Sequence, residues 1–158
     1  MGLNDFLKSM FGSKSDRDLK KLRPILQKIK QVYPTVEALS NDELRARVTA
    51  IRQEIQDDVQ PLRDEIAKIK VEVEELDFEK RQPLWDKVDK LQKEVLDRIQ
   101  AKLDEVLPEV FAIVKDTARR FAQNETIEVT ATDFDRKLAA EGRDFLTIEG
   151  DKATYYNH

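Results

Sequence analysis

Two long series of apolar residues, each spaced at intervals of three and four, constrain the fold of this chain more than any other feature. The first series spans residues 44–76 and the second spans residues 84–110. This spacing places apolar side chains on one face of an α-helix, as in a coiled coil. The polar segment 77–83 lies between them, and its Pro83 suits the first turn of a new helix. The sequence therefore predicts two long amphipathic helices separated by a short break.

Two amphipathic helices joined by a short polar segment can bury their stripes by folding back antiparallel. We favour this hairpin because the partner lies in the same chain and the contacts are local. Such a hairpin predicts a monomer, with Trp85 packing at its tip or, as a second interpretation, anchoring a partner. The alternative is a parallel dimer of one uninterrupted rod, which would use Leu62, Ile66, Ile69, Val73 and Leu76.

The first part of the chain is basic and amphipathic. Residues 1–30 contain eight Lys or Arg and three Asp, a net charge of +5, whereas the whole chain has −4. Such a basic front can meet an anionic lipid surface, an RNA or an acidic partner, and the simpler interpretation is a solvated helix face. A short helix here would align an apolar stripe made of Leu3, Phe6, Leu7, Met10 and Phe11.

Local signals set the expected helix boundaries outside the hairpin. Ser15 is expected to begin a second helix, whose apolar stripe reads Leu19, Leu22, Ile25 or Leu26, Ile29 and Val32. We expect a kink or a break at Pro24 and the end of this helix at Pro34. Residues 40–43 form a capping box that starts the next helix, and Pro108 is expected to start another.

The pattern changes after Asn124 from helical to strand-like. Residues 127–130 alternate as in a strand, Thr132 is expected to cap a short helix, and residues 145–156 predict a β-hairpin. The predicted fold class is mainly α, with amphipathic N-terminal helices, a long antiparallel coiled-coil-like helical hairpin and a small α+β C-terminal segment containing this β-hairpin. A two-stranded ribbon is marginal alone, and the chain stops soon after Tyr155 and Tyr156 without a polar tail, so we expect it to be cut from something larger.

The composition leaves little room for an active site. The chain has no cysteine and one histidine, His158, which excludes thiol nucleophiles, disulfides and His-pair metal sites. Its glycines stand at 2, 12, 142 and 150, so no phosphate-binding loop is present. We expect no catalytic, cofactor-binding or metal-binding residue in this chain. Nucleic-acid binding is disfavoured because no aromatic residues are interleaved with the lysines.

Three motifs, taken in order, resemble the opening of SecA, the ATPase motor family of bacterial preprotein translocation. They are FLKSMFGSKSDRDLKKL at 6–22, LSNDELRARVTAIRQEI at 39–55 and LPEVFAIVKDTARRF at 107–121. The resemblance covers less than half of the chain. Residues 56–106 have no counterpart in the usual family pattern and are expected to be an insertion, and residues 124–158 are expected to be a second one.

The resemblance implies the N-terminal part of an ATP-driven translocation motor. It assigns amphipathic and basic helices to 1–39, the helical hairpin to 40–106, the opening helix of the nucleotide-binding domain to 107–123 and a truncated α+β segment to 124–158. The implied roles are a helical brace, a membrane- and channel-facing front and a docking arm. The ATP site would lie beyond this chain, so ATP and Mg are expected only in the longer parent, which would be an ATPase.

The implied partners are acidic phospholipid and a SecYEG-type channel, with preprotein bound by the full-length motor. The residues that match the family's membrane-facing segment are Leu3, Phe6, Leu7, Lys8, Met10, Phe11 and Lys14, with electrostatic help from Arg17, Lys20, Lys21 and Arg23. The implied location is cytoplasmic and peripheral to the inner membrane. The alternative to the membrane role is that this N-terminal apolar stripe packs against other helices of the same protein. The alternative function is a free-standing coiled-coil adaptor or scaffolding protein with only protein-binding activity.

Overall fold

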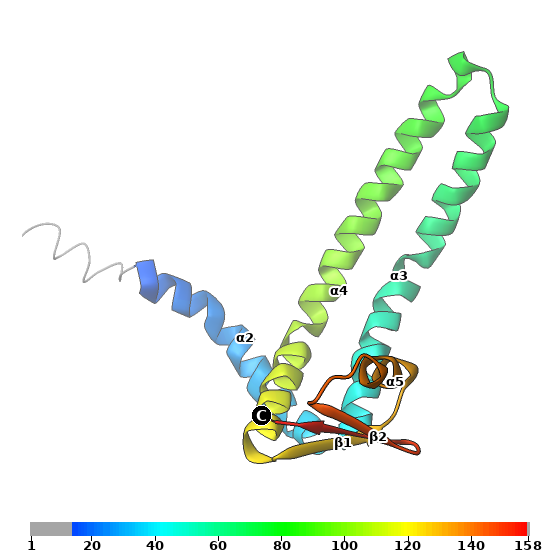
Figure 1. Ribbon diagram of the computed structural model, residues 1–158. Helices are drawn as coiled ribbons and strands as arrows, with labels where there is room; N and C mark the ends of the chain where they lie inside the picture. The colour runs from blue at the N-terminus through cyan, green and yellow to red at the C-terminus, as the bar shows by residue number, and fades with distance from the viewer. Residues whose placement is uncertain (1–13, 158) are drawn as a thin grey trace, which may run out of the picture. The chain divides into compact units, whose positions relative to one another are not determined.

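The computed structural model describes residues 14–157, with side chains from residue 18 onward. In chain order the elements are α2 (Lys14–Glu37), α3 (Asn41–Glu75), the 3-10 helix η1 (Phe78–Lys80), α4 (Gln82–Gln123), β1 (Thr126–Thr130), α5 (Asp133–Ala140), β2 (Leu146–Glu149) and β3 (Lys152–Tyr156) (Figure 1). The predicted fold class, mainly helical with a small α+β segment at the end, is confirmed.

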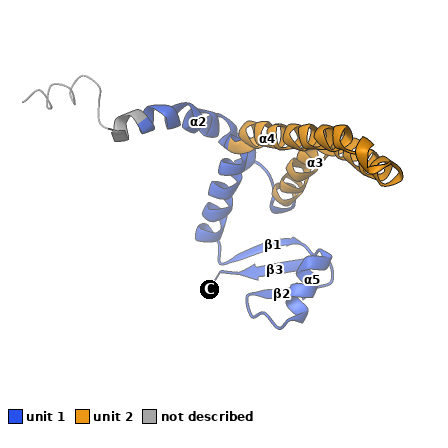
Figure 2. Cartoon of the chain, turned by 90° about the horizontal axis from the view of Figure 1, so that it is seen from above, with its two compact units in different colours: residues 1–42, 108–158 blue, residues 43–107 orange. Residues whose placement is uncertain are grey.

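The chain divides into two compact units (Figure 2). Unit 1 consists of residues 1–42 and 108–158, and unit 2 consists of residues 43–107. The four-part division drawn from the sequence stays a prediction.

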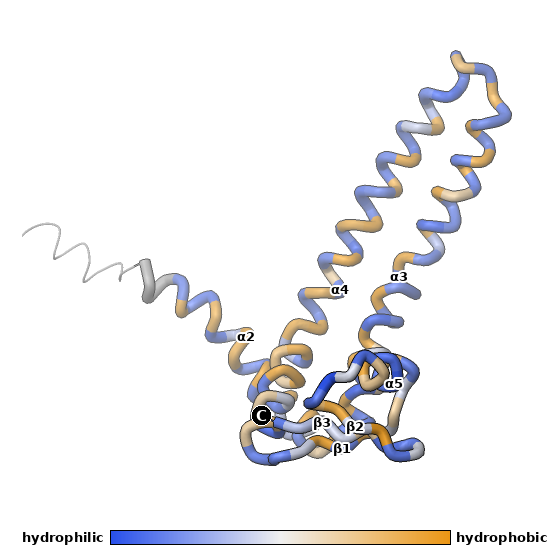
Figure 3. Tube along the Cα trace, viewed as in Figure 1, coloured by the Kyte–Doolittle hydropathy of each residue, from blue (hydrophilic) through white to orange (hydrophobic). Residues whose placement is uncertain are grey.

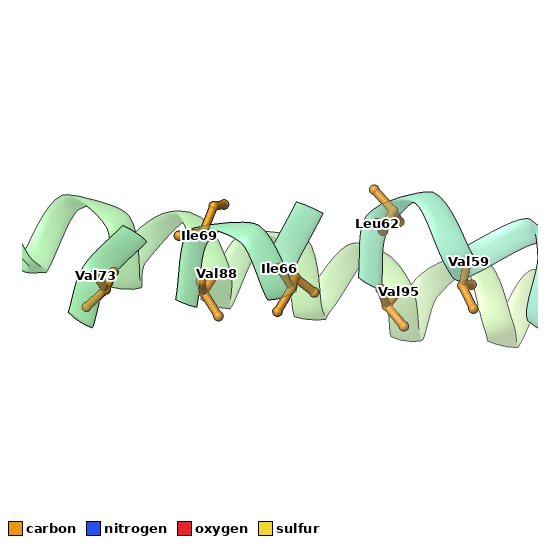
Figure 4. Close-up of a cluster of buried hydrophobic side chains, with 7 residues drawn as sticks. All are labelled: Val59, Leu62, Ile66, Ile69, Val73, Val88 and Val95. Carbon is orange, nitrogen blue, oxygen red and sulfur yellow. The ribbon is translucent and has the colours of Figure 1, made fainter. Parts of the chain in front are cut away.

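Unit 2 is the predicted helical hairpin. Its two arms come from α3 and α4, and apolar side chains from both arms form one buried cluster (Figure 4). The members of this cluster are Val59, Leu62, Ile66, Ile69 and Val73 from α3, with Val88 and Val95 from α4. Four of the positions that a parallel dimer would have used are therefore buried in the seam of the chain's own hairpin. The break between the arms lies where the sequence predicts it, with η1 inside it and Pro83 in the first turn of α4.

Two predictions about prolines are wrong. Pro34 was expected to end α2, which continues to Glu37, and Pro108 was expected to start a helix but lies inside α4. A local break at Pro24 is also absent, because α2 is assigned as one helix through that residue. Proline removes one N–H donor and its ring crowds the carbonyl four residues earlier, but its own carbonyl still accepts, as the 3.3 Å bond from Ala38 N to the Pro34 carbonyl illustrates. The cost of this lost hydrogen bond is offset because apolar residues continue at helical spacing before and after each proline.

Residues 126–156 form a three-stranded antiparallel sheet in the order β1-β3-β2. Helix α5 packs against the core of this sheet. The predicted β-hairpin corresponds to β2 and β3, and Gly150 in its turn has a positive φ of 59°. Thr132 caps α5 as predicted, in a reciprocal capping box with Asp135. The predicted strand at 127–130 pairs with β3 across the whole length of β1. This third strand gives the ribbon a core of Val129, Leu146 and Ala153 against α5.

Candidate functional site

The first half of α2 exposes aliphatic and basic side chains close together in the sequence. Leu19, Leu22 and Leu26 are between 48% and 56% exposed, although their spacing puts them on one helix face. The basic residues among them are exposed as well, and the alternation of apolar and polar positions along α2 is visible in Figure 3. We define the α2 surface as Leu19, Lys20, Lys21, Leu22, Arg23 and Leu26. It is a cationic surface with an uncovered aliphatic stripe.

The α2 surface contains only part of the sequence-predicted site. Lys20, Lys21 and Arg23 are exposed, and among the described side chains, which begin at residue 18, no carboxylate forms an ion pair with any of them. Lys14 and Arg17 lie at the start of α2, but their side chains are not described. The other predicted residues, which are Leu3, Phe6, Leu7, Lys8, Met10 and Phe11, lie outside the described residues. The sequence predicts the leucines as an apolar stripe but does not mark them as site residues, because periodicity alone does not distinguish a buried stripe from an exposed one.

The buried carboxylate of Asp116 fixes the C-terminal part of α2 within unit 1. This side chain has no exposed surface and accepts a 3.2 Å hydrogen bond from the Tyr33 hydroxyl of α2. On its own helix it accepts from Arg119 Nε at 2.8 Å and from Arg120 Nε at 2.6 Å. Lys115 adds a cation–π contact, its Nζ lying 4.0 Å from the centre of the Tyr33 ring. The carboxylate therefore joins two helix segments that are far apart in the sequence.

Arg120 extends this network to the second sequence motif. Its guanidinium donates to Asn41 Oδ1 at 2.7 Å and to the Leu39 carbonyl at 2.5 Å. Asn41 in turn donates from Nδ2 to the carbonyl of Glu128 in β1 at 3.0 Å. The motifs LSNDEL and LPEVFAIVKDTARRF thus meet through side-chain hydrogen bonds, which we call the Asp116 network.

The pKa of Asp116 is held below its ordinary value. Burial acts to raise the pKa because it disfavours the charged form, but the hydrogen bonds and positive charges of Arg119 and Arg120 together outweigh it. The ionised carboxylate consequently stabilises the folded state at neutral pH.

This depressed pKa predicts an acid-sensitive unit 1. The stabilisation is fully present above the unfolded carboxyl pKa of about 4 and is lost as pH falls through the folded value. Urea unfolding followed by tyrosine near-ultraviolet circular dichroism reports unit 1, since Tyr33, Tyr155 and Tyr156 all belong to it. In the Asp116→Asn variant the loss of stability below about pH 4 should be smaller than in the unmodified chain. The same pH dependence in both proteins would contradict the assignment.

A second exposed apolar face lies on the part of α4 that belongs to unit 1. Val110, Phe111, Val114 and Phe121 are exposed there, at intervals typical of one side of a helix. We call these four residues the α4 stripe. An exposed apolar helix face of this kind is typical of a surface that packs against another part of a protein or against a partner.

The two fully buried carboxylates among the described residues, Asp116 and Asp135, are both engaged in hydrogen bonds within the protein. Within residues 14–157 no group of His, Asp or Glu side chains could hold a metal ion. The other fully buried carboxylate, Asp135, accepts from the Thr132 N–H and hydroxyl at 2.8 Å each and from the Tyr155 hydroxyl. Asp116 and Asp135 are thus both engaged in structural hydrogen bonds. The same part of the chain contains no helix that is both long enough and apolar enough to cross a bilayer.

Comparison with known proteins decides the family. The family model described as the SecA DEAD-like domain matches residues 7–135. The chain belongs to the SecA family. The protein translocase subunit SecA of Porphyromonas gingivalis strain ATCC 33277 is 58% identical over 158 residues, and that of Parabacteroides distasonis is 50% identical over the same length. The SecA of Christiangramia forsetii is 37% identical over 156 residues, or 98% of the chain. No solved structure gave a significant match.

The SecA matches cover the whole chain but only part of the relatives. The first two relatives align over 100% of this chain, which spans 14% of their length. Residues 56–106 and 124–158 are therefore shared with these SecA proteins. Their status as insertions relative to the rest of the SecA family stays a prediction.

Proposed function

We propose that this chain forms the N-terminal part of an ATP-driven preprotein translocation motor of the SecA type. In this proposal ATP and Mg are bound by another part of the longer protein, and that protein works with preprotein and a SecYEG-type channel at the inner membrane. The chain itself contributes a membrane- and channel-facing front, a helical brace and a docking arm. The observation that carries the proposal is the exposed α2 surface in a chain of the SecA family.

The front corresponds to the α2 surface. Aliphatic side chains that are half exposed gain free energy when they enter the headgroup and acyl boundary of a bilayer, and neighbouring cations add attraction to anionic lipid. Neither contribution is large alone, since three leucines bury little area. Because α2 carries both exposed leucines and exposed basic residues, we propose acidic phospholipid as its ligand.

The brace corresponds to the Asp116 network and the α4 stripe. The network holds α2, the beginning of α3 and β1 to the end of α4 within unit 1. The α4 stripe leaves Phe111 and Val114 uncovered, 53% and 62% exposed. We assign it to packing against the rest of the nucleotide-binding domain in the longer protein, because an exposed apolar helix face of this size gains free energy when it is covered.

The docking arm corresponds to the helical hairpin of unit 2. A free-standing adaptor that dimerises as a parallel rod would need the seam residues Ile66 and Ile69, which the hairpin uses internally. The hairpin therefore favours an arm that stays monomeric over an adaptor rod.

Flotation with lipid vesicles tests the membrane role of the α2 surface. The full chain should float with vesicles that contain phosphatidylglycerol and should not float with pure phosphatidylcholine vesicles. The double variant Leu19→Ser, Leu22→Ser should lower the affinity for acidic vesicles at least about tenfold, because two aliphatic anchors are lost. Added salt should weaken the binding of the unmodified chain as well.

The matched control is the double variant Leu96→Ser, Leu103→Ser, which removes two exposed leucines from unit 2. This control should float like the unmodified chain. An equal loss in both double variants, or no binding of the unmodified chain to acidic vesicles, would contradict the membrane role.

A further inference from the structure

The tip of the helical hairpin exposes large apolar side chains. Phe78 in η1 is 86% exposed, and Trp85 in the first turns of α4 is 40% exposed. Val71, seven residues before Phe78 near the end of α3, is exposed as well. The packing role predicted for Trp85 accounts for only part of its surface. Exposed aromatic side chains are typical of the anchors of protein interfaces.

The same tip has a net negative charge, because residues 71–85 contain five Asp or Glu and two basic residues, Lys80 and Arg81. Residues 71–79 contain five Asp or Glu and no Lys or Arg. Asp77 has a nearby cation, Lys80, at 3.4 Å. In the described chain, by contrast, no ion pair involves Glu72, Glu74, Glu75 or Glu79. Four carboxylates that lie near Phe78 in the sequence therefore remain available to a partner.

These carboxylates do not serve the helix that carries them. Glu74 and Glu75 are the last two residues of α3, and the last turn contains no basic residue. The negative end of the helix dipole disfavours acidic side chains at this position and favours cations. Arg81 supplies one cation, donating from Nε to the Leu76 carbonyl at 2.8 Å. These acidic side chains therefore do not stabilise the end of α3, and their negative charge is available to a cationic partner.

We propose that the acidic hairpin tip, formed by Val71, Glu72, Glu74, Glu75, Phe78, Glu79 and Trp85, binds a basic protein segment that carries an aliphatic or aromatic side chain. Charge complementarity identifies this occupant. Anionic lipid and nucleic acid are repelled by the tip, whereas a cationic segment neutralises the carboxylates and its apolar side chain covers the aromatic pair. The inference deepens the proposed docking arm and rests on it, by naming the chemistry of the partner.

Trp85 provides a direct readout because it is the only tryptophan in the chain. The probe is a synthetic amphipathic helical peptide made of Leu and Lys, titrated into the full chain, with a Leu and Glu peptide of equal length as the control. The cationic peptide should shift the Trp85 emission to shorter wavelength as the indole leaves water. The anionic peptide should leave the emission unchanged.

Two variants locate the binding at the tip. Phe78→Ser and the double variant Glu74→Lys, Glu75→Lys should each weaken binding of the cationic peptide on the order of tenfold. The charge-matched control is Asp97→Lys, Asp104→Lys, which changes exposed acids on the body of the hairpin and should leave the affinity unchanged. Far-ultraviolet circular dichroism should show the same helix content in all variants, since the altered side chains are exposed.

Several outcomes would overturn the inference. They are no emission shift with the cationic peptide, equal binding of the anionic peptide, or an equal loss in the Asp97 and Asp104 control. If Phe78→Ser instead abolishes flotation with acidic vesicles, the tip contacts membrane and not a protein segment. The Leu19 and Leu22 variant separates the two proposals, because it removes lipid binding and should leave peptide binding unchanged.

Discussion

Replacing Asp116 by alanine should lower the free energy of unfolding of unit 1 by about 3 kcal/mol. The substitution leaves the guanidinium of Arg120, only 12% exposed, without its buried carboxylate, and it removes the acceptor of the Tyr33 hydroxyl. Loss of one partner from a buried ion pair costs about 3–5 kcal/mol, and the low end applies here because Arg119 remains partly in water. Urea unfolding should therefore show an earlier tyrosine transition.

The control for this prediction is Asp97→Ala on the same helix, where the side chain is exposed. It should change stability by no more than about 0.5 kcal/mol. The emission of Trp85 reports unit 2 in the same experiment, since this tryptophan lies in residues 43–107. Equal stability of Asp116→Ala and the unmodified chain would show that the Asp116 network does not hold unit 1 together.

Replacing Ile69 by aspartate should unfold the hairpin of unit 2 or destabilise it by at least about 4 kcal/mol. Ile69 is only 4% exposed and belongs to the cluster shared by α3 and α4. The change removes buried apolar area and places a carboxylate in the seam with no cation to pair with it. The Trp85 emission should then show the unfolding transition of unit 2 at lower urea concentration.

Leu96→Asp is the matched control for the hairpin, because Leu96 lies in α4 and is 66% exposed. It should leave the Trp85 transition within about 0.5 kcal/mol of its original position. A different outcome would be a dimeric unmodified chain that Ile69→Asp converts to a folded monomer. That result would favour the parallel rod and the adaptor function over the self-closed hairpin.

The sequence predicted the parts of the fold that depend on local chemistry. The long apolar series, the break at 77–83 and the Thr132 cap are all read from residues a few positions apart. The Asp116 network could not be predicted in this way, because its hydrogen bond from Tyr33 spans 83 residues of chain. The proline errors have a local cause, since continued apolar periodicity around Pro34 and Pro108 outweighs the loss of one hydrogen bond each.

The candidate site was only partly predictable for a related reason. The basic residues Lys20, Lys21 and Arg23 are visible in the sequence as charge, and charge is normally exposed. The leucines of the α2 surface have the same spacing as those of a buried helix face, so their exposure became known only from the structure. The acidic residues of the hairpin tip stand out once their position at the C-terminal end of α3 is known, because only there do they oppose the helix dipole.

The central proposal is that this chain forms the membrane- and channel-facing front of a preprotein translocation motor. A preprotein import assay tests this proposal most directly. The complete product of the gene that encodes this chain should import a preprotein into inverted inner-membrane vesicles when ATP is supplied. The Leu19→Ser, Leu22→Ser variant of that product should import less while it still hydrolyses ATP in solution. A complete gene product that neither hydrolyses ATP nor imports preprotein would contradict the account.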